Sequence, residues 1–450
     1  MKLSISDLGS LDEAMKRGEY PDYIYAYPPR QAYRPIARSA REIRPIVRAS
    51  LEERPNINLY VHIPFCRQVC RFCNLYTTTA HSDESVYDRY IDRVLEEAAA
   101  YARAGLLPAI PRWRTLYLGG GTPSVLSIAQ LERLVSGLRG YLSIVEVEET
   151  AIEVAPETAS PEYLHGLRAA GFDRVSMGFQ STLAEEVRNI GRSYPDTRQA
   201  EIAAAAMTAG FRNLCLDLIF GLPGQDAASW LLSLRTVVAM RPNTICCYQW
   251  TSRPHTGFHR MGMTKPEGRR LRELYELACA ELLAAGYEQE THVRWVTDGG
   301  GYLQKQYHWG LETLIGLGAG ARSYFWHTDL RNGYSLQDRR QALSAYLASD
   351  GLGWDSALEG YEMSADERRR KAMVLGLHNL RRQWCREHFT EDLIESFAKE
   401  IDGLADRGLI NITPDAIQLT ARGRSYRDAI VQLFVSDRVR GLAESWNYDE

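Results

Sequence analysis

The sequence predicts an α/β fold organised around a parallel sheet, and two observations support this. First, short apolar runs alternate with helical patterns, and the expected strands lie at 58–64, 115–118, 150–155, 173–178, 213–219 and 244–249. Second, two intervening helices carry start signals: Ser127 and Gln130 form a capping box, and Ser160-Pro161 opens a helix that closes at Gly171. Six such units predict parallel strands with an active site at their C-terminal ends.

Length and charge limit the classes of function. A chain of 450 residues is expected to form two or three units with sizeable cores, and a formal net charge of −4 gives no general attraction for nucleic acid or an acidic membrane. No apolar run reaches the about eighteen residues of a membrane span, and the N-terminus lacks the layout of a secretion signal. We therefore expect a cytoplasmic protein without nucleic-acid or membrane partners.

Residues 1–55 are expected to form an N-terminal extension. Tyrosines crowd around prolines between Tyr20 and Tyr33, which favours an extended aromatic segment in a position to close over an active site. Arginines then recur at helical spacing at Arg34, Arg38, Arg41, Arg44 and Arg48. They either grip an anionic substrate or partner, or form a solvated helix face paired with Glu42, Glu52 and Glu53.

Three cysteines follow the first predicted strand, which ends at Pro64. Cys66, Cys70 and Cys73 have the spacing Cys-x3-Cys-x2-Cys, which can hold one metal centre but supplies only three thiolates. A structural zinc needs a fourth ligand, for which His62 and His81 are candidates, whereas an iron-sulfur cluster on three cysteines keeps one iron open. Buried free thiols are a third alternative. Five other cysteines lie in apolar patterns typical of reduced core residues: Cys215, Cys246, Cys247, Cys279 and Cys385.

With Phe72 directly before its last cysteine, this motif resembles the radical S-adenosylmethionine (SAM) superfamily, and Tyr60-Val61-His62-Ile63-Pro64-Phe65-Cys66 resembles the HemN-like branch. That branch contains oxygen-independent coproporphyrinogen III oxidase, a haem chaperone, anaerobic haem-opening enzymes and class C radical SAM methyltransferases. The resemblance implies a partial (β/α)6 TIM-type barrel that carries a 4Fe-4S cluster and SAM and is reduced by a flavodoxin or ferredoxin-type donor.

The resemblance also implies the domain boundaries. After the extension, the radical SAM partial barrel is expected at 56–300 and a barrel-completing and linking segment at 301–363. A small C-terminal HemN-like helical domain is expected at 364–450, in which residues 412–420 form a short hairpin.

By the same resemblance, two SAM molecules share one cavity. Gly119-Gly120-Gly121-Thr122 follows the second strand and resembles the segment that receives the amino group of SAM. The SAM on the cluster is expected to contact Tyr60, Gly120, Glu153 and, through its backbone, Thr251. The second SAM is expected to contact Phe72, Gly121, Thr122, Gln180, Arg192 and Asp217. A structural ion pair between Asp217 and Arg192 is the alternative, because an unpaired carboxylate in so apolar a strand is unfavourable.

The resemblance leaves the reaction open beyond reductive cleavage of SAM to a 5′-deoxyadenosyl radical. Haem chaperones carry a segment resembling His-Asn-x-x-Tyr-Trp where this chain has Gln304-Lys305-Gln306-Tyr307-His308-Trp309, and coproporphyrinogen oxidases continue with Gly-Cys where it has Asn74-Leu75. The leading hypothesis is therefore a class C enzyme that transfers a carbon derived from the SAM methyl group to an sp2 carbon of a specialised metabolite, giving a methylated or cyclopropanated product.

The alternatives are a coproporphyrinogen III oxidase-like or haem-modifying tetrapyrrole enzyme and a haem chaperone. The residues that carry out acid or base steps stay undetermined, with Glu290, His292, Tyr307 and His308 as candidates.

Overall fold

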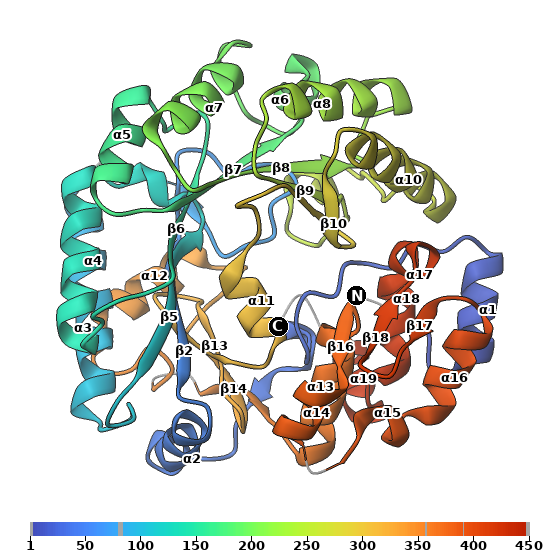
Figure 1. Ribbon diagram of the computed structural model, residues 1–450. Helices are drawn as coiled ribbons and strands as arrows, with labels where there is room; N and C mark the ends of the chain where they lie inside the picture. Colours follow the sequence, from blue (N-terminus) through green and yellow to red (C-terminus); the bar gives the residue numbers. More distant parts are fainter. Residues whose placement is uncertain (1–2, 80–83, 356–357, 390, 447–450) are drawn as a thin grey trace.

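The computed structural model describes residues 3–79, 84–355, 358–389 and 391–446, and it shows a strongly curved sheet with helices around its outer face and a smaller C-terminal unit beside it (Figure 1). The large sheet has thirteen strands in the order β1-β15-β14-β13-β12-β2-β5-β6-β7-β8-β9-β11-β10. Its ends, β1 and β10, do not pair with each other, so the barrel is partial, as the resemblance implied.

The six strands predicted from the sequence form the parallel centre of this sheet. They are β2 (Asn56–Ile63), β5 (Arg112–Gly120), β6 (Glu149–Val154), β7 (Arg174–Gln180), β8 (Asn213–Phe220) and β9 (Thr244–Gln249). Each pairs in parallel with the next along the chain, which confirms the predicted parallel sheet. A further parallel strand, β12 (Thr313–Leu317), joins the other edge of β2 and was not expected.

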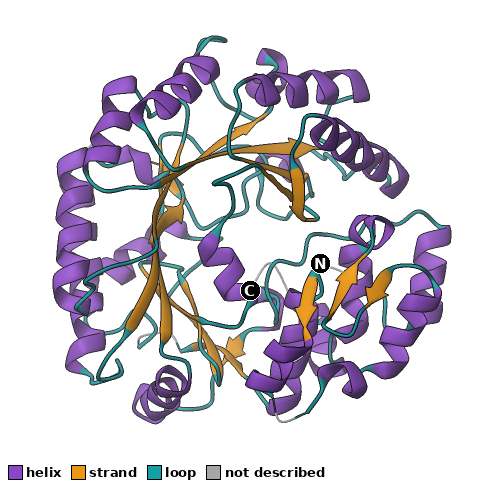
Figure 2. Cartoon of the chain, viewed as in Figure 1, coloured by secondary structure: helices purple, strands orange, loops and turns teal. Residues whose placement is uncertain are grey.

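Helices form the outer layer of the barrel (Figure 2). They are α3 (Ser85–Arg103), α4 (Ile128–Leu142), α5 (Pro161–Ala169), α6 (Ala184–Asn189), α7 (Arg198–Ala209), α8 (Ala227–Ala239) and α10 (Gly268–Ala284). The Ser127 side chain accepts from the backbone N–H of Gln130 in the predicted capping box, and Ser160 caps α5, with Pro161 in its first turn. Both start signals are thus confirmed.

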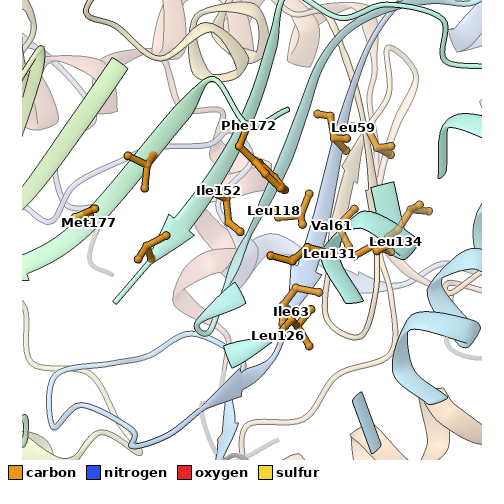
Figure 3. Packing of buried hydrophobic residues seen from close by; sticks show 14 of the residues in the cluster. Leu59, Val61, Ile63, Leu118, Leu126, Leu131, Leu134, Ile152, Phe172 and Met177 are labelled. Atoms are coloured by element: carbon orange, nitrogen blue, oxygen red, sulfur yellow. The ribbon is translucent and has the colours of Figure 1, made fainter. Parts of the chain in front are cut away.

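The two faces of each strand have different roles. On β2, Leu59, Val61 and Ile63 project outward and pack, fully buried, near Leu131 and Leu134 of α4 (Figure 3). Burial of each such side chain contributes about 1.5–3 kcal/mol. Because side chains alternate along a strand, the intervening residues Asn58, Tyr60 and His62 project into the barrel. The same packing that stabilises the sheet therefore turns polar groups toward its interior.

Antiparallel strands extend both edges of the parallel centre. They are β10 (Glu288–Thr291) and β11 (Arg294–Val296) beside β9, and β13 (Arg322–Tyr324), β14 (Thr328–Arg331), β15 (Glu359–Glu362) and β1 (Arg34–Pro35) beyond β12. Helix α11 (Leu303–Trp309) lies inside the arc of strands and contacts β2 and β5 (Figure 1). It closes one end of the barrel interior.

The C-terminal unit is mainly helical, as expected. Its helices are α13 (Ala365–Gly376), α14 (Arg382–His388), α15 (Leu393–Ser396), α16 (Ala398–Asp406), α17 (Ala421–Ser425), α18 (Arg427–Ile430) and α19 (Asp437–Glu444), and α12 (Arg339–Ala348) precedes them beside the barrel. The predicted hairpin is confirmed as β17 (Ile410–Ile412) and β18 (Ala416–Leu419), and β16 (Asn379–Arg381) adds a third strand.

The N-terminal extension shares a hydrophobic core with the C-terminal unit. Leu11 of α1 (Leu8–Lys16), Ile24 and Tyr27 are buried in the same cluster as Leu404 and Phe434. Helix α2 (Ala40–Glu53) carries only three arginines of the predicted stripe, because Arg34 lies in β1 and Arg38 precedes the helix. Arg44 pairs with Asp355 and Arg38 with Glu362, and not with the expected glutamates. None of the helices among the described residues is both long and apolar enough to cross a bilayer.

Candidate active site

The three motif cysteines lie in one loop at the C-terminal end of β2, and hydrogen bonds to neighbouring segments hold this loop in place. Cys66 belongs to β3 (Phe65–Cys66), which pairs with β4 (Thr78–Thr79). The backbone of Arg71 accepts from Phe258 N–H and donates to the carbonyl of Ile190, which fixes the loop to neighbouring segments. All three cysteines line one cavity of about 210 Å³, together with Phe72, whose ring packs on a small apolar cluster. The loop therefore presents three thiols to one space.

The spacing of these thiols suits a cluster better than a single ion. Cys66, Cys70 and Cys73 all lie in the described part of the chain, but their sulfur atoms are not all within 4.8 Å of one another, as ligands of one ion would be. Burial raises the pKa of Cys66 to about 12 and that of Cys73 to about 11, so both thiols need a cationic centre to ionise. The donor set fits an iron-sulfur cluster.

His62 is not free to act as the fourth ligand of a zinc ion. Its Nε2 donates to the carbonyl of Tyr76 at 2.8 Å, and its Nδ1 accepts from the hydroxyl of Tyr60 at 3.1 Å, so both ring nitrogens are engaged. Burial lowers the pKa of His62 to about 4, and the ring is neutral. The other proposed zinc ligand, His81, lies outside the described residues.

The glycine segment after β5 approaches the cluster loop too closely for any side chain. Gly120 has φ +114°, and a Cβ at Gly121 would lie 2.7 Å from the carbonyl oxygen of Phe65. The backbone N–H of Thr122 donates to that same oxygen at 2.8 Å, and its hydroxyl donates to Cys66 Sγ at 3.3 Å. Only a glycine run allows these two loops to form one wall of the cavity.

Glu153 faces this wall from β6. Its Oε1 accepts from the Tyr117 hydroxyl at 2.9 Å and its Oε2 from the Gly120 N–H at 3.0 Å. Burial raises the pKa of Glu153, so a positively charged ligand would restore its ionised form. SAM carries an ammonium and a sulfonium, and the carboxylate fits that chemistry. Gly120 and Glu153 line both the cluster cavity and a second cavity, which Tyr60 also lines.

The residues expected to hold a second SAM all line the cluster cavity, among them Gln180 of β7, Asp217 of β8 and Arg192, which follows α6. Gln180 ends β7 at a register shift with φ 69°, a strained conformation for a residue other than glycine. Arg192 donates through Nε to Cys70 Sγ at 3.2 Å and through Nη1 to the carbonyl of Gly178. Burial raises the pKa of Asp217, whose Oδ2 accepts from Ser176 at 3.1 Å.

The structural alternative for these residues, an ion pair between Asp217 and Arg192, is wrong. Within the described part of the chain Arg192 pairs instead with Glu157, at 3.8 Å, and Asp217 has no ion-pair partner. Thr251 lies away from both cavities, and its hydroxyl donates to Asp22 of the N-terminal extension at 3.4 Å.

A second cavity of about 270 Å³ adjoins the cluster cavity. Its walls are aromatic and cationic, and they include Tyr25, Arg30, Tyr76, Tyr302, Lys305, Arg322, Tyr324 and Tyr334. None of these residues was named in advance as a site residue, although Lys305 lies in the segment 304–309 and Tyr25 in the aromatic segment that was expected to close over an active site. Tyr25 and Arg30 come from the N-terminal extension, which therefore covers this cavity.

Of the four acid–base candidates, only His308 lies in this cavity. Tyr307, its neighbour on α11, donates to Glu148, which directly precedes β6. Glu290 pairs with Arg294, and His292 Nε2 lies 3.2 Å from Asp428 Oδ2 in the C-terminal unit. These three residues do not line the space beside the cluster loop. Both ring nitrogens of His308 are buried without a hydrogen-bond partner in the described residues.

Comparisons with known proteins agree with this geometry. The pattern described as "Radical SAM superfamily" matches residues 60–237, which run from β2 to α8. The haem chaperone HemW of Synechocystis is 31% identical over 288 residues, covering 61% of this chain and 69% of that protein. The oxygen-independent coproporphyrinogen III oxidase of Salmonella typhimurium is 29% identical over 399 residues, covering 83% of each.

A solved structure shows the same fold. The coproporphyrinogen III oxidase HemN of Escherichia coli, which its description calls a radical SAM enzyme, is 24% identical with a TM-score of 0.75. The match covers 96% of this chain and 99% of that one, so it includes the N-terminal and C-terminal units as well as the barrel.

We predict that Cys66→Ala, Cys70→Ala and Cys73→Ala each abolish the visible absorbance of a reconstituted 4Fe-4S cluster, because no other thiol of the described chain reaches this cavity. Anaerobic reconstitution followed by iron and sulfide analysis measures this. Cys279→Ala, which changes a half-buried thiol on α10, is the matched control and should keep the wild-type iron content. A Cys66→Ala protein with full cluster occupancy would contradict the assignment.

Proposed function

Because the chain belongs to the HemN-like family of radical SAM proteins, which uses a 4Fe-4S cluster and SAM, we propose that it is a radical SAM enzyme whose substrate is a carboxylated tetrapyrrole. The relatives are a haem chaperone and a coproporphyrinogen oxidase, and haem and coproporphyrinogen are both tetrapyrroles with propionate side chains. These relatives support the tetrapyrrole alternative better than the leading hypothesis from the sequence. Methyl transfer to a specialised metabolite has no support among them.

The main support for this proposal is that cationic groups without counter-charges line the second cavity. Lys305 Nζ donates to the carbonyl of Tyr25 at 2.8 Å and has no carboxylate partner within the described residues. Burial and the positive charges of Arg322 and Arg294 lower the pKa of Lys305 well below its usual value. Since an unpaired buried charge is unfavourable, an anionic ligand would stabilise the ionised form of this side chain.

Arg322 and Arg30 extend the same positive surface. Arg322 donates to the Tyr25 hydroxyl at 2.9 Å, and its Nη1 is buried without a partner among the described residues. Burial alone would raise the pKa of Tyr25, but Arg322 and Arg30 together lower it, which shows how positive the local potential is. Guanidinium groups bind carboxylates through two parallel hydrogen bonds, so propionates suit them well.

Aromatic rings line the remainder of this cavity. Tyr60 and Tyr302 line it, and Tyr117 behind them stacks on both, with ring centroids 6.0 Å and 5.1 Å apart. Such a wall provides flat apolar contact for the pyrrole rings, while the cations hold the carboxylates. The cluster and SAM, when bound, supply the radical chemistry; Glu153 orients the cationic ligand, and the tyrosine wall excludes water from the space beside it.

The volume of the cavity implies that the N-terminal extension moves. About 270 Å³ is below the usual range of ligand cavities, about 300–1,000 Å³, and a tetrapyrrole needs more. Tyr25 and Arg30 cover the cavity, and Asp22 beside them pairs with Arg253 at 3.0 Å and Lys265 at 2.9 Å. We propose that these two ion pairs open for entry and close again over the bound substrate.

Haem carriage is a second candidate, and one observation favours it. Gln304 replaces the histidine of the family segment and donates to the carbonyl of Leu59 at 3.0 Å. His308, however, lies in the same cavity, neutral and with both ring nitrogens unpartnered among the described residues. Neutral imidazole is a common iron ligand, so His308 offers haem an axial ligand that the family segment no longer provides.

We further propose a cytoplasmic location and a flavodoxin or ferredoxin-type electron donor. All eight cysteines are free thiols, which suits a reducing compartment. The cluster that the family uses requires a one-electron reductant.

We predict that Lys305→Gln and Arg322→Gln each weaken binding of coproporphyrin III roughly 10- to 100-fold, because each removes a charged hydrogen bond to a propionate. Fluorescence titration of the reconstituted protein measures the affinity. The methyl ester of the porphyrin, which lacks carboxylates, should bind equally to all variants. Arg331→Gln is the matched control, since this arginine lines the same cavity but already pairs with Glu359.

Equal affinity of all variants for the free acid would contradict a tetrapyrrole substrate in this cavity. A His308→Ala variant separates the two candidates: loss of haem absorbance with unchanged coproporphyrin affinity would favour haem carriage.

We also propose that two SAM molecules bind, as the residues around the cluster cavity suggest. Equilibrium dialysis should find two equivalents in the wild-type holoprotein. Gln180→Ala should lose one of them, because Gln180 lines only the cluster cavity, and Glu153→Gln should weaken the other. One equivalent in the wild type at saturation would refute the second site.

A further inference from the structure

Two cysteines and one aspartate meet inside the barrel, next to the cluster cavity. Cys215 and Asp217 lie two residues apart on β8, and Cys246 on β9 is in register with Asp217. Residues two apart on a strand share one face, and Asp217 lines the cluster cavity, so these side chains project into the barrel. Among the described residues, these three form the group of potential metal ligands in which all ligand atoms lie within 4.8 Å of one another.

The separations match those of one tetrahedral ion. Cys215 Sγ lies 3.8 Å from Cys246 Sγ and 3.5 Å from Asp217 Oδ1. Two sulfur atoms bonded to zinc at about 2.3 Å and a tetrahedral angle lie about 3.8 Å apart. With a carboxylate oxygen at about 2.0 Å, the sulfur-to-oxygen separation is about 3.5 Å. The three ligand atoms therefore need little rearrangement to bind a single ion.

A disulfide fits this pair less well than an ion. The register partner of Cys215 is Thr244, so Cys246 lies two positions further along the neighbouring strand. Strands about 4.8 Å apart with a rise of about 3.3 Å per residue put the two Cα atoms about 8 Å apart. Disulfides span at most about 7 Å, so oxidation would require the backbone to move.

Two buried arginines beside the thiols are only partly satisfied. Arg294 of β11 is in register with Cys246, and Arg174 of β7 interacts electrostatically with Cys215. Arg174 Nη1 and Arg294 Nη2 have no hydrogen-bond partner in the described residues. Two thiolates and a carboxylate around a divalent ion keep a net negative charge, which Arg174 would balance. Arg294 already pairs with Glu290 through Nε, but its Nη2 stays available as a hydrogen-bond donor to the site. Neutral thiols would provide no negative charge for these guanidiniums.

We propose that Cys215, Asp217 and Cys246 bind one zinc ion. Binding releases the two thiol protons to solvent and changes no oxidation state. Ser176 holds Asp217 Oδ2 at 3.1 Å, so Oδ1 serves the ion, and the carboxylate is fixed in orientation at the cavity wall. Three protein ligands leave a fourth position for water or for a ligand entering from that cavity. The inference is independent of the substrate class.

The test uses the holoprotein, in which iron already occupies Cys66, Cys70 and Cys73. After anaerobic equilibration with zinc and removal of the excess, elemental analysis should find one zinc per wild-type chain. Cys215→Ser and Cys246→Ser should lower zinc affinity at least tenfold without changing iron content. Cys247→Ser is the matched control, because this neighbouring thiol is buried on the outer face of β9 with the apolar core. It should keep the zinc.

X-ray absorption spectroscopy of zinc in the wild-type protein tests the proposal even if a serine variant fails to fold. The expected shell contains two sulfur atoms at about 2.3 Å and oxygen or nitrogen at about 2.0 Å. A shell of three sulfurs, a shell without sulfur, or a wild-type chain that keeps no zinc would overturn the proposal. Full zinc occupancy in both serine variants would overturn it equally.

Discussion

Charge buried inside the barrel without a counter-charge is the constraint on which the rest of the structure depends. The outward faces of the strands are apolar and stabilise the sheet, and alternation along each strand turns Tyr60, Glu153 and Asp217 inward. Burial disfavours the ionised forms of Glu153 and Asp217 and of Lys305 across the cavity. Each of these groups would be stabilised in its charged form by a ligand of the opposite charge: a cationic ligand for the carboxylates and an anionic ligand for the lysine. The unpaired charges therefore predict the sign of the charge on each ligand.

The sequence predicted those parts of the molecule that depend on local pattern. Six strands, their parallel order, two helix starts and the Cys66 loop follow from periodicity, caps and spacing over a few residues. The family resemblance added the partial barrel and most residues of the cluster cavity. Contacts between distant segments could not be predicted: Tyr25 meets Lys305 and Arg322 only because the N-terminal extension crosses the barrel and shares a core with the C-terminal unit. For the same reason three of the four acid–base candidates lie outside the two cavities, since nothing in the sequence shows which of the neighbouring residues Tyr307 and His308 on α11 points into the cavity.

The two cavities divide the chemistry between them. The cluster cavity holds the thiols, the glycine wall and two raised-pKa carboxylates, and it suits cationic cofactors. The adjoining cavity is aromatic and positive and suits an anionic substrate. Gly120 and Glu153 line both cavities, so a cofactor held in one would lie next to a substrate held in the other. Asp217 also lies close to Cys215 and Cys246. A bound metal ion would explain this grouping of two thiols and a carboxylate better than a SAM site alone does.

We propose that the radical acts on a tetrapyrrole and not on the methyl group of a second SAM. Anaerobic turnover with methyl-deuterated SAM, a reductant and coproporphyrinogen III tests it most directly, by mass spectrometry of 5′-deoxyadenosine and of the tetrapyrrole. We expect the tetrapyrrole to stimulate release of 5′-deoxyadenosine, this product to contain no deuterium, and the tetrapyrrole to change mass. Deuterium from the SAM methyl group in 5′-deoxyadenosine, with the tetrapyrrole unchanged and without effect on the rate, would contradict it and support methyl transfer.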